Sequence, residues 1–322
     1  MADMGAEKHI FAGLEGVAER AVELRHELHR HPELGYQEVF TSGVVCRELE
    51  RMGIEHTRGW AGGTGVVGLI RGGLGEGKCV ALRADMDALP IVEETGAGYA
   101  STIPGVMHAC GHDGHMAVLL GAAAILKEQA RGLRGTIKLI FQPAEEGGCG
   151  AEKLCAEGVL EKPRVDAIFG LHGWPGLKVG MVATRAGPLL ASVDGFRIVI
   201  TGRGGHAASP QDAIDPVLCA AACVTALQSI VSREVSPHDA AVVTVSQIAG
   251  GTAFNVIPDR VEMNGTIRAL SQERHRSLIE SIERICRGVA AGYRCGGAFA
   301  YYGPQPVTSN TPALAEFLRE PA

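Results

Sequence analysis

Short apolar runs that alternate with stretches of helical periodicity constrain the fold of this chain most strongly. Five runs in the first half have the length and aliphatic content of buried strands: residues 65–70, 78–84, 136–142, 165–171 and 180–184. Helical patterns precede or separate them, over residues 14–31, 39–52, 116–129 and 152–159. Buried strands that alternate with helices predict an α/β fold in which helices cover a central sheet.

The pattern changes near Gly187. Strand-like runs then cover residues 196–201, 241–249 and 261–270, and long helical patterns cover residues 216–233 and 272–291. This order of strand, helix, strand, strand and helix is typical of a small ferredoxin-like unit. The chain of 322 residues is therefore expected to form two domains.

Charge and cysteine usage limit the partners and the compartment. The net charge of −6 argues against nucleic acid or an anionic membrane surface as the main partner, because both attract basic proteins. No apolar run approaches the roughly 18 residues of a membrane span, and the first residues lack a secretion signal. The nine cysteines are scattered without a Cys-x-x-Cys pair, which favours reduced thiols and a cytoplasmic location.

One loop is unusually rich in metal-ligating side chains. Residues 107–115 read MHACGHDGH and precede an apolar helical pattern. Cys110 and His112 are two residues apart in a loop with glycine, so both can face one ion, and a thiolate with a neutral imidazole suits zinc and similar metals. The alternatives are a helix start with Asp113 at its positive end, or a Cys110 nucleophile paired with histidine.

An acidic pair follows the strand-like run 136–142. Glu145 and Glu146 would be costly to bury without partners. Neighbouring side chains of an extended segment diverge, so one carboxylate can face a metal while the other faces water or substrate. That division suits metal-assisted hydrolysis, with a carboxylate as the base. The alternative is a solvated acidic turn.

Two further polar positions follow strand-like runs. His172 comes directly after the run 165–171, where it is either a ligand or an ordinary strand-end residue. Asp85 and Asp87 follow the run 78–84 and share a face, so they can orient ligand histidines or cap a turn. Sites in open α/β sheets form beyond the carboxyl ends of strands, which is where all these residues are expected.

Eight segments together carry a family resemblance. The chain resembles the amidohydrolase branch of the metallopeptidase family that contains hippurate hydrolase, N-acyl-amino-acid deacylases and plant auxin-conjugate hydrolases. The matching segments are HRHPELG from His29, RADMDALP from Arg83, MHACGHDGH from Met107, FQPAEEG from Phe141, GLHGWPG from Gly170, GRGGHAA from Gly202, FNVIP from Phe254 and GTIR from Gly265.

The resemblance implies a fold and an assembly. The fold is a zinc-peptidase-like three-layer α/β sandwich with an inserted ferredoxin-like domain. Residues 1–187 and 304–322 would form the catalytic domain, and residues 188–303 would form a lid or dimerisation domain. A homodimer through the lid domain follows from the same resemblance.

The resemblance also implies a metal site and its chemistry. Cys110, His112, Glu146 and His172 fall on the family's ligand positions for two divalent ions, Mn²⁺ or Zn²⁺, with Co²⁺ or Ni²⁺ as further options. Glu145 falls on the general base that activates water. The implied function is metal-dependent hydrolysis of the amide bond of a small N-acyl amino acid.

Four other positions take supporting roles through the resemblance. Asp87 falls on the acidic residue that supports the metal-binding groups, and His206 falls on a histidine that polarises the scissile carbonyl across the dimer. Asn255 and Arg268 match positions at the carboxylate end of the substrate. An arginine offers a bidentate fork to a carboxylate, although Arg268 also suits an ordinary surface position on a strand.

The sequence departs from the family after the lid. No histidine follows His275, so the family's final histidine ligand and its glycine-rich acidic loop have no counterpart. We therefore expect a C-terminally shortened member in which one ion lacks a ligand. The alternative functions are a catalytically impaired family member and a metallo-carboxypeptidase or dipeptidase.

Overall fold

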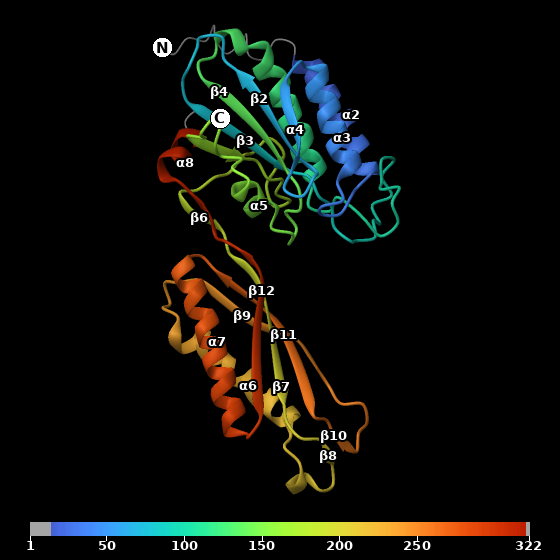
Figure 1. The fold of residues 1–322 in the computed structure, drawn as a ribbon, viewed down its shortest axis with the longest axis vertical. Helices are drawn as coiled ribbons and strands as arrows, with labels where there is room; N and C mark the ends of the chain where they lie inside the picture. The colour runs from blue at the N-terminus through green and yellow to red at the C-terminus, as the bar shows by residue number, and fades with distance from the viewer. Residues whose placement is uncertain (1–13, 320–322) are drawn as a thin grey trace. The chain divides into compact units, whose positions relative to one another are not determined.

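The computed structural model describes residues 14–319, and the chain separates into two compact units, Met1–Leu177 and Lys178–Ala322 (Figure 1). The first unit contains helices α2 to α5, a short 3₁₀ turn and strands β1 to β5. Their bounds are α2 Leu14–Arg30, α3 Val39–Arg51, β1 Glu55–Trp60, β2 Gly65–Arg71, β3 Cys79–Asp85, α4 His112–Glu128, η1 Ala130–Gly132, β4 Thr136–Gln142, α5 Gly150–Ala156 and β5 Ala167–Gly170.

The five strands of the first unit form one mixed sheet in the order β1-β2-β4-β3-β5. The hairpin β1–β2 and the pair β2–β4 are antiparallel, whereas β3 is parallel to both β4 and β5. The carboxyl ends of β4, β3 and β5 therefore meet along one edge of the sheet.

The alternation of side chains along the strands builds a core on each face of this sheet. Leu139 and Phe141 of β4 pack with α2, α3 and α4, whereas Ile140 faces the opposite core with Leu154 of α5. Successive strand residues point to opposite faces, so one buried strand serves both cores. The result is a helix–sheet–helix sandwich, as predicted, with α2, α3 and α4 together on one side (Figure 1).

The second unit centres on a four-stranded antiparallel sheet in the order β12-β7-β11-β9, packed against α6 and α7. This strand order and the alternation of strands and helices confirm the ferredoxin-like prediction. The bounds in this unit are β6 Gly187–Leu190, β7 Val193–Thr201, β8 Gly205–His206, η2 Pro210–Asp212, α6 Pro216–Ser229, η3 Ile230–Glu234, β9 Ala241–Gly250, β10 Val256–Ile257, β11 Arg260–Ala269, α7 Gln272–Gly292, β12 Gly296–Gln305, β13 Thr308–Asn310 and α8 Pro312–Arg319.

A glycine allows close packing in the middle of this sheet. A Cβ atom at Gly265 would lie 2.2 Å from the ring of Phe196 on the neighbouring strand β7. Phe196 is fully buried, and it packs in the core beneath α6 and α7. The missing side chain at Gly265 therefore makes room for the largest apolar group of β7.

Most predicted elements are present, but one predicted strand is absent, and two long strands and the short strands β6, β8, β10 and β13 were not predicted. The strand predicted at residues 180–184 is wrong, because Gly180 has a φ of 85° and the next strand begins at Gly187. Strands β1 and β12 were not predicted, since β1 is largely exposed and β12 contains three glycines. The division into a catalytic domain of residues 1–187 plus 304–322 and a lid of residues 188–303 stays a prediction.

One stretch contradicts the expectation that no apolar run reaches the length of a membrane span. Among the described residues, the helical stretch Pro216–Glu234 has the length and the apolar composition needed to cross a membrane; these two criteria are the only ones it meets. Cys219, Cys223 and Leu227 on this stretch are fully buried in the core of the second unit. Core packing accounts for these three apolar positions, whereas Val217 and Leu218 on the same stretch are exposed.

A buried lysine fastens a loop of the first unit to the sheet. Lys138 on β4 is 2% exposed, and its ammonium donates hydrogen bonds to the carbonyls of Val159, Glu161 and Pro163 at 2.7–2.8 Å. Burial lowers the pKa of Lys138. Three carbonyl dipoles converge on one cation, so this side chain holds residues 159–163 against the sheet.

Replacing this lysine should destabilise the first unit selectively. Lys138→Met fills similar space but leaves three carbonyls without their donor, so the free energy of unfolding should fall by about 3 kcal/mol. Both tryptophans, Trp60 and Trp174, lie in the first unit, so their fluorescence during urea unfolding measures this loss. Lys127→Met, which removes a single exposed bond to the Gly53 carbonyl, should cost less than about 1 kcal/mol; equal losses would contradict the interpretation.

Candidate metal centre

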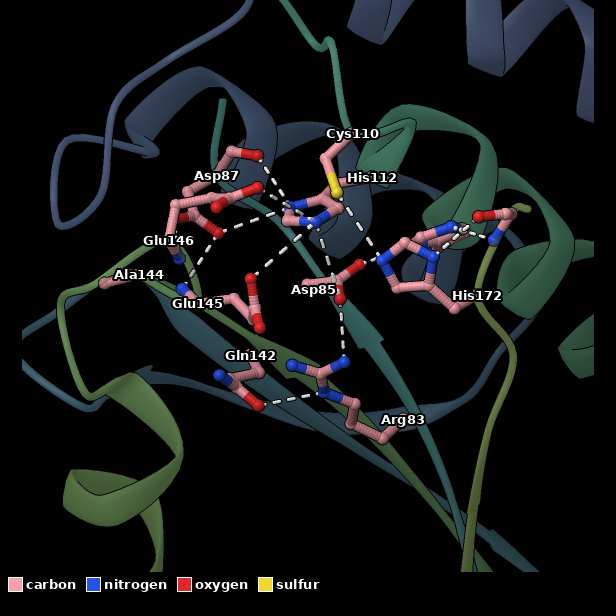
Figure 2. A network of polar contacts seen from close by, with 12 residues as sticks. Arg83, Asp85, Asp87, Cys110, His112, Gln142, Ala144, Glu145, Glu146 and His172 are labelled. Atoms are coloured by element: carbon pink, nitrogen blue, oxygen red, sulfur yellow. Dashed lines mark hydrogen bonds and ion pairs between the residues drawn. The ribbon is translucent and has the colours of Figure 1, made fainter. Parts of the chain in front are cut away.

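Polar side chains from four segments of the first unit converge where β3, β4 and β5 end (Figure 2). Asp85 ends β3, Glu145 and Glu146 follow β4, and His172 follows β5. The fourth segment is the start of α4, where Gly111 takes a φ of 83° that favours glycine. This turn places Cys110 just before the helix, and His112 is the first residue of the helix.

Two overlapping groups of side chains could each hold a metal ion. Within each group, one ligand atom per residue lies within 4.8 Å of all the others. The groups are Cys110, His112 and Glu146, and Asp85, His112, His115 and His172. The Sγ atom of Cys110 also lies 3.5 Å from Nε2 of His172, so the structure brings all four predicted ligands together.

Hydrogen bonds determine which nitrogen of His112 is available. Its Nδ1 lies 2.8 Å from the Asp87 carbonyl, which only accepts, so Nδ1 carries the proton in the neutral ring. The other nitrogen, Nε2, is buried without a hydrogen-bond partner among the described residues. It lies 3.7 Å from Asp85, 3.8 Å from Glu146 and 4.0 Å from Glu145. A buried lone pair among carboxylates is the arrangement that a bound cation would satisfy.

His172 and His115 differ in whether a ring nitrogen remains available to bind a metal. Nδ1 of His172 lies 2.7 Å from the Gly173 carbonyl, so its Nε2 can bind a metal. In His115, Nδ1 lies 2.6 Å from Asp85 and Nε2 accepts the Gly173 N–H at 2.7 Å. Both nitrogens of His115 are thus engaged, and its geometry suits holding the His172 loop rather than binding an ion.

The pKa shifts show that the site attracts positive charge. Burial alone would lower the pKa of His112, but Asp87, the Cys110 sulfur and the charge of Asp85 raise it to about 11. The Cys110 sulfur likewise raises the pKa of His172 to about 9. His112 and His172 in turn lower the pKa of the Cys110 thiol. Sulfur, nitrogen and carboxylate donors around an excess of negative charge fit divalent metal ions.

The acidic pair is arranged differently from the expectation. The backbone N–H groups of Glu145 and Glu146 both donate to the Asp87 carboxylate at 2.9 Å. Ala144 has a φ of 49°, so the segment turns after β4 instead of continuing as a strand. The expectation of divergent side chains is wrong, because both carboxylates lie within 4.0 Å of the same His112 nitrogen.

A polar network beneath the site could not be assigned from the sequence alone. Arg83 donates to Asp85 at 2.7 Å and to Gln142 at 2.8 Å, across the parallel strands β3 and β4. Asp85 is 1% exposed; burial would raise its pKa, but His115 and Arg83 together lower it. The i, i+2 spacing of Arg83 and Asp85 was the available signal, because it places both side chains on one face of a strand.

His206 and Asn255 meet in the second unit. His206 on β8 pairs with Val256 on β10, the residue that follows Asn255. His206 and Asn255 both line a cavity of about 730 Å³. Arg268 lies at the far end of β11, roughly 26 Å from Arg260 at the cavity. Its guanidinium bonds to the Ile267 carbonyl and to Thr266, so within this unit the structure does not bring Arg268 to the cavity.

Comparison with known proteins identifies the family. Residues 81–291 match the model of peptidase family M20/M25/M40, which spans the metal-site segments and the ferredoxin-like sheet up to α7. The chain belongs to peptidase family M20/M25/M40. The predicted resemblance to its amidohydrolase branch is confirmed by the relatives described next.

M20 relatives are similar along most of the chain. N-acetylcysteine deacetylase of Bacillus subtilis (strain 168) is 44% identical over 291 residues, which cover 90% of this chain and 76% of the relative. IAA-amino acid hydrolase ILR1-like 4 of Arabidopsis thaliana is 47% identical over 302 residues, covering 92% and 68%. A crystal structure described as a dinuclear metal-binding peptidase of the M20 family from Bacillus subtilis has a TM-score of 0.80 and 39% identity, covering 94% and 78%.

Removing the thiol should weaken metal binding in this M20 protein. Cys110→Ala deletes one donor of the Cys110–His112–Glu146 group, so we expect bound metal per chain to fall and the Kd for Mn²⁺ or Zn²⁺ to rise by at least about tenfold. Elemental analysis and calorimetric titration measure both quantities. The control is Cys155→Ala, which changes an exposed thiol. Metal content equal to that of the unsubstituted protein would remove Cys110 from the ligand set.

Proposed function

We propose that this protein is a metal-dependent amidohydrolase that cleaves the amide bond of N-acyl amino acids. The observation that carries the proposal is the cluster of Cys110, His112, Glu146 and His172, with the Glu145 carboxylate beside it. Both relatives described above are named for acting on a conjugate of an amino acid. A family member with this donor set is therefore best suited to small N-acyl amino acid substrates.

We propose that two divalent ions bind at this centre, with Mn²⁺ and Zn²⁺ as the leading candidates. Cys110, His112, Glu146 and His172 would hold them, and Asp87 would keep the acidic loop and His112 in place. The thiol and imidazoles suit Zn²⁺, whereas the carboxylates also suit Mn²⁺. The crystal structure with a TM-score of 0.80, which is described as dinuclear, supports the number of ions.

Glu145 is positioned to act as the base. Burial, together with the charge of Glu146, raises the pKa of Glu145. A carboxylate whose pKa lies nearer to neutral pH is better suited to take up and then release a proton. Bound divalent ions would lower the pKa of water and polarise the amide carbonyl. Glu145 takes a proton from the attacking water while the water oxygen bonds to the carbonyl carbon. Glu145 then gives this proton to the amide nitrogen as the C–N bond breaks, which releases a carboxylic acid and the amino acid.

Residues of the second unit would complete the reaction. Nδ1 of His206 accepts the Ala208 N–H at 3.0 Å, so the neutral ring carries its proton on Nε2 and can donate it to the carbonyl oxygen. Asn255 lies at the same cavity, and Arg268 offers a fork to a carboxylate. We assign Asn255 and Arg268 to the carboxylate end of the substrate, with Asn255 supplied by one copy of the proposed dimer and Arg268 by the other, because the two positions lie far apart within one copy.

Substitution of the base should separate turnover from metal binding. Glu145→Gln keeps the size of the side chain but cannot take the proton, so kcat should fall by roughly 10²- to 10⁴-fold while metal content is unchanged. Release of free amino acid from N-acetyl and N-benzoyl amino acids in the presence of Mn²⁺ measures turnover. Glu152→Gln, at an exposed position on α5, should leave kcat unaltered.

Two outcomes of this assay would contradict the assignment. Unchanged turnover by Glu145→Gln would remove Glu145 from the role of base. Cleavage of peptides with no cleavage of N-acyl amino acids would favour a metallo-carboxypeptidase or dipeptidase.

We further propose a homodimer through the ferredoxin-like unit. Strand β9 lies at an edge of the sheet and pairs only with β11 among the described strands. Ile248 and Val242 on β9 are 54% and 45% exposed. An edge strand with unpaired backbone groups and exposed apolar side chains is suited to pairing with a second copy.

A charge on this edge should dissociate the dimer. Ile248→Lys places an ammonium where two apolar edges would meet, so sedimentation velocity at micromolar concentration should show a monomer in place of a dimer. Val22→Lys, at a position on α2 that is 55% exposed, is the control and should not change the mass. A monomeric unsubstituted protein would contradict the proposed dimer.

Location and domain boundaries complete the proposal. The nine cysteines are all free thiols, which supports the reducing environment of the cytoplasm. The catalytic domain would comprise residues 1–187 and 304–322, with the lid at residues 188–303. The compact sheet supports treating that middle segment as one domain: β7, β9 and β11 lie within it, and β12 continues two residues past its end to Gln305.

A further inference from the structure

Two buried carboxylates hold three successive backbone N–H groups of the acidic loop. Ala144 N–H donates to Glu38 Oε1 at 2.8 Å, and Glu145 and Glu146 N–H donate to the two oxygens of Asp87 at 2.9 Å. Asp87 belongs to the site already described. Glu38 lies far from it in sequence, and its role has no counterpart in the mechanism above.

Glu38 is an unusual residue for its position. It is fully buried at the N-cap of α3, yet its side chain makes no capping bond to that helix. Glu33 instead accepts the N–H groups of Phe40 and Thr41 in the first turn. The second oxygen of Glu38 accepts the hydroxyl of Thr64 at 2.7 Å. The buried carboxylate thus has a donor on each oxygen, and one of these donors is the loop backbone.

The backbone around Glu38 also closes on the acidic loop. A Cβ atom at Gly35 would lie 3.0 Å from the Cβ of Ala144, and the hydroxyl of Tyr36 donates to the Gly148 carbonyl. Ala144 has a left-handed φ of 49°, which costs free energy for a residue with a side chain. The hydrogen bond from Ala144 to Glu38 holds the chain in this conformation at the residue directly before Glu145.

We propose that Glu38 is a positioning residue, whose acceptor oxygen fixes Ala144 and thereby places the carboxylates of Glu145 and Glu146. The inference rests on the proposed function, in which Glu145 is the base and Glu146 a metal ligand. Displacement of a reacting group by about 1 Å can reduce turnover by roughly 10²-fold. Loss of the acceptor should therefore lower kcat more than it raises KM, and it should weaken Mn²⁺ binding through Glu146.

Three substitutions of Glu38 separate the acceptor from charge and bulk. Glu38→Met keeps the length without an acceptor and should lower kcat by roughly 10- to 100-fold per folded, metal-loaded molecule. Glu38→Gln should recover most of this loss, because its carbonyl can accept the Ala144 N–H and its amide can donate to Thr64. If Glu38→Met does not fold, Glu38→Asp takes its place, since the shorter side chain withdraws the oxygen from Ala144.

The matched control is Glu48→Gln. Glu48 is also buried on α3, but it pairs with Arg20 and Arg51 away from the site. Its substitution should lower the Tm without changing kcat per folded molecule. A purely structural role for Glu38 predicts the same behaviour for Glu38→Met, so unaltered kcat in Glu38→Met, or in Glu38→Asp, would overturn the proposal. Glu38→Gln as impaired as Glu38→Met would overturn it as well.

Titration with Mn²⁺ alone separates this inference from the proposed function. If the unsubstituted protein cleaves no N-acyl amino acid, the proposed function fails, but the Kd for Mn²⁺ still reports the placement of Glu146. A rise of about tenfold in Glu38→Met, reversed in Glu38→Gln, would then support the positioning role. In that inactive protein, equal Kd values in all variants would overturn it.

Discussion

Asp87 joins the two loops on which the rest of the site depends. Its carboxylate binds the backbone of Glu145 and Glu146, and its carbonyl accepts the proton of His112. These contacts hold two segments against Asp87, which lies just beyond the end of β3. One segment is the acidic loop that follows β4, and the other is the first residue of α4. The distances between the candidate ligands thus depend on the side chain and the backbone carbonyl of one residue, which is 2% exposed.

The concentration of acidic and thiol groups gives the centre its chemistry. Burial should drive Asp85, His112 and Cys110 toward their neutral forms, yet their mutual contacts favour charged forms instead. The negative charges of such a site attract positive charge. A proton on His112 neutralises part of this negative charge, and a bound divalent cation neutralises more of it. The hydrogen bonds of His112 and His172 leave Nε2 as the ligand atom in both rings.

Much of the fold followed from periodicity, and the failures have physical causes. The strand Thr136–Gln142 was predicted to its ends because five of its seven residues are apolar or β-branched and its last five residues are buried. The helix α4 begins at His112, four residues before the predicted start at residue 116. The prediction missed this first turn because its residues, HDGH, are polar and show no apolar periodicity, although three of them are buried in the structure. Strand β12 contains glycine and tyrosine in place of a β-branched run, and its pairing with β7 comes only from the tertiary fold.

The sequence by itself determined the residue types of the centre and their order along the chain. Cys110 and His112 in one loop, Glu145 and Glu146 after one strand and His172 after another could be identified because ligand chemistry and strand ends are local properties. The tertiary structure alone decided which histidine nitrogens face the centre, that both nitrogens of His115 are engaged, and that Glu38 reaches Ala144. These depend on contacts between residues as many as 106 positions apart, which no local pattern encodes because only the packed sheet brings them within hydrogen-bonding distance.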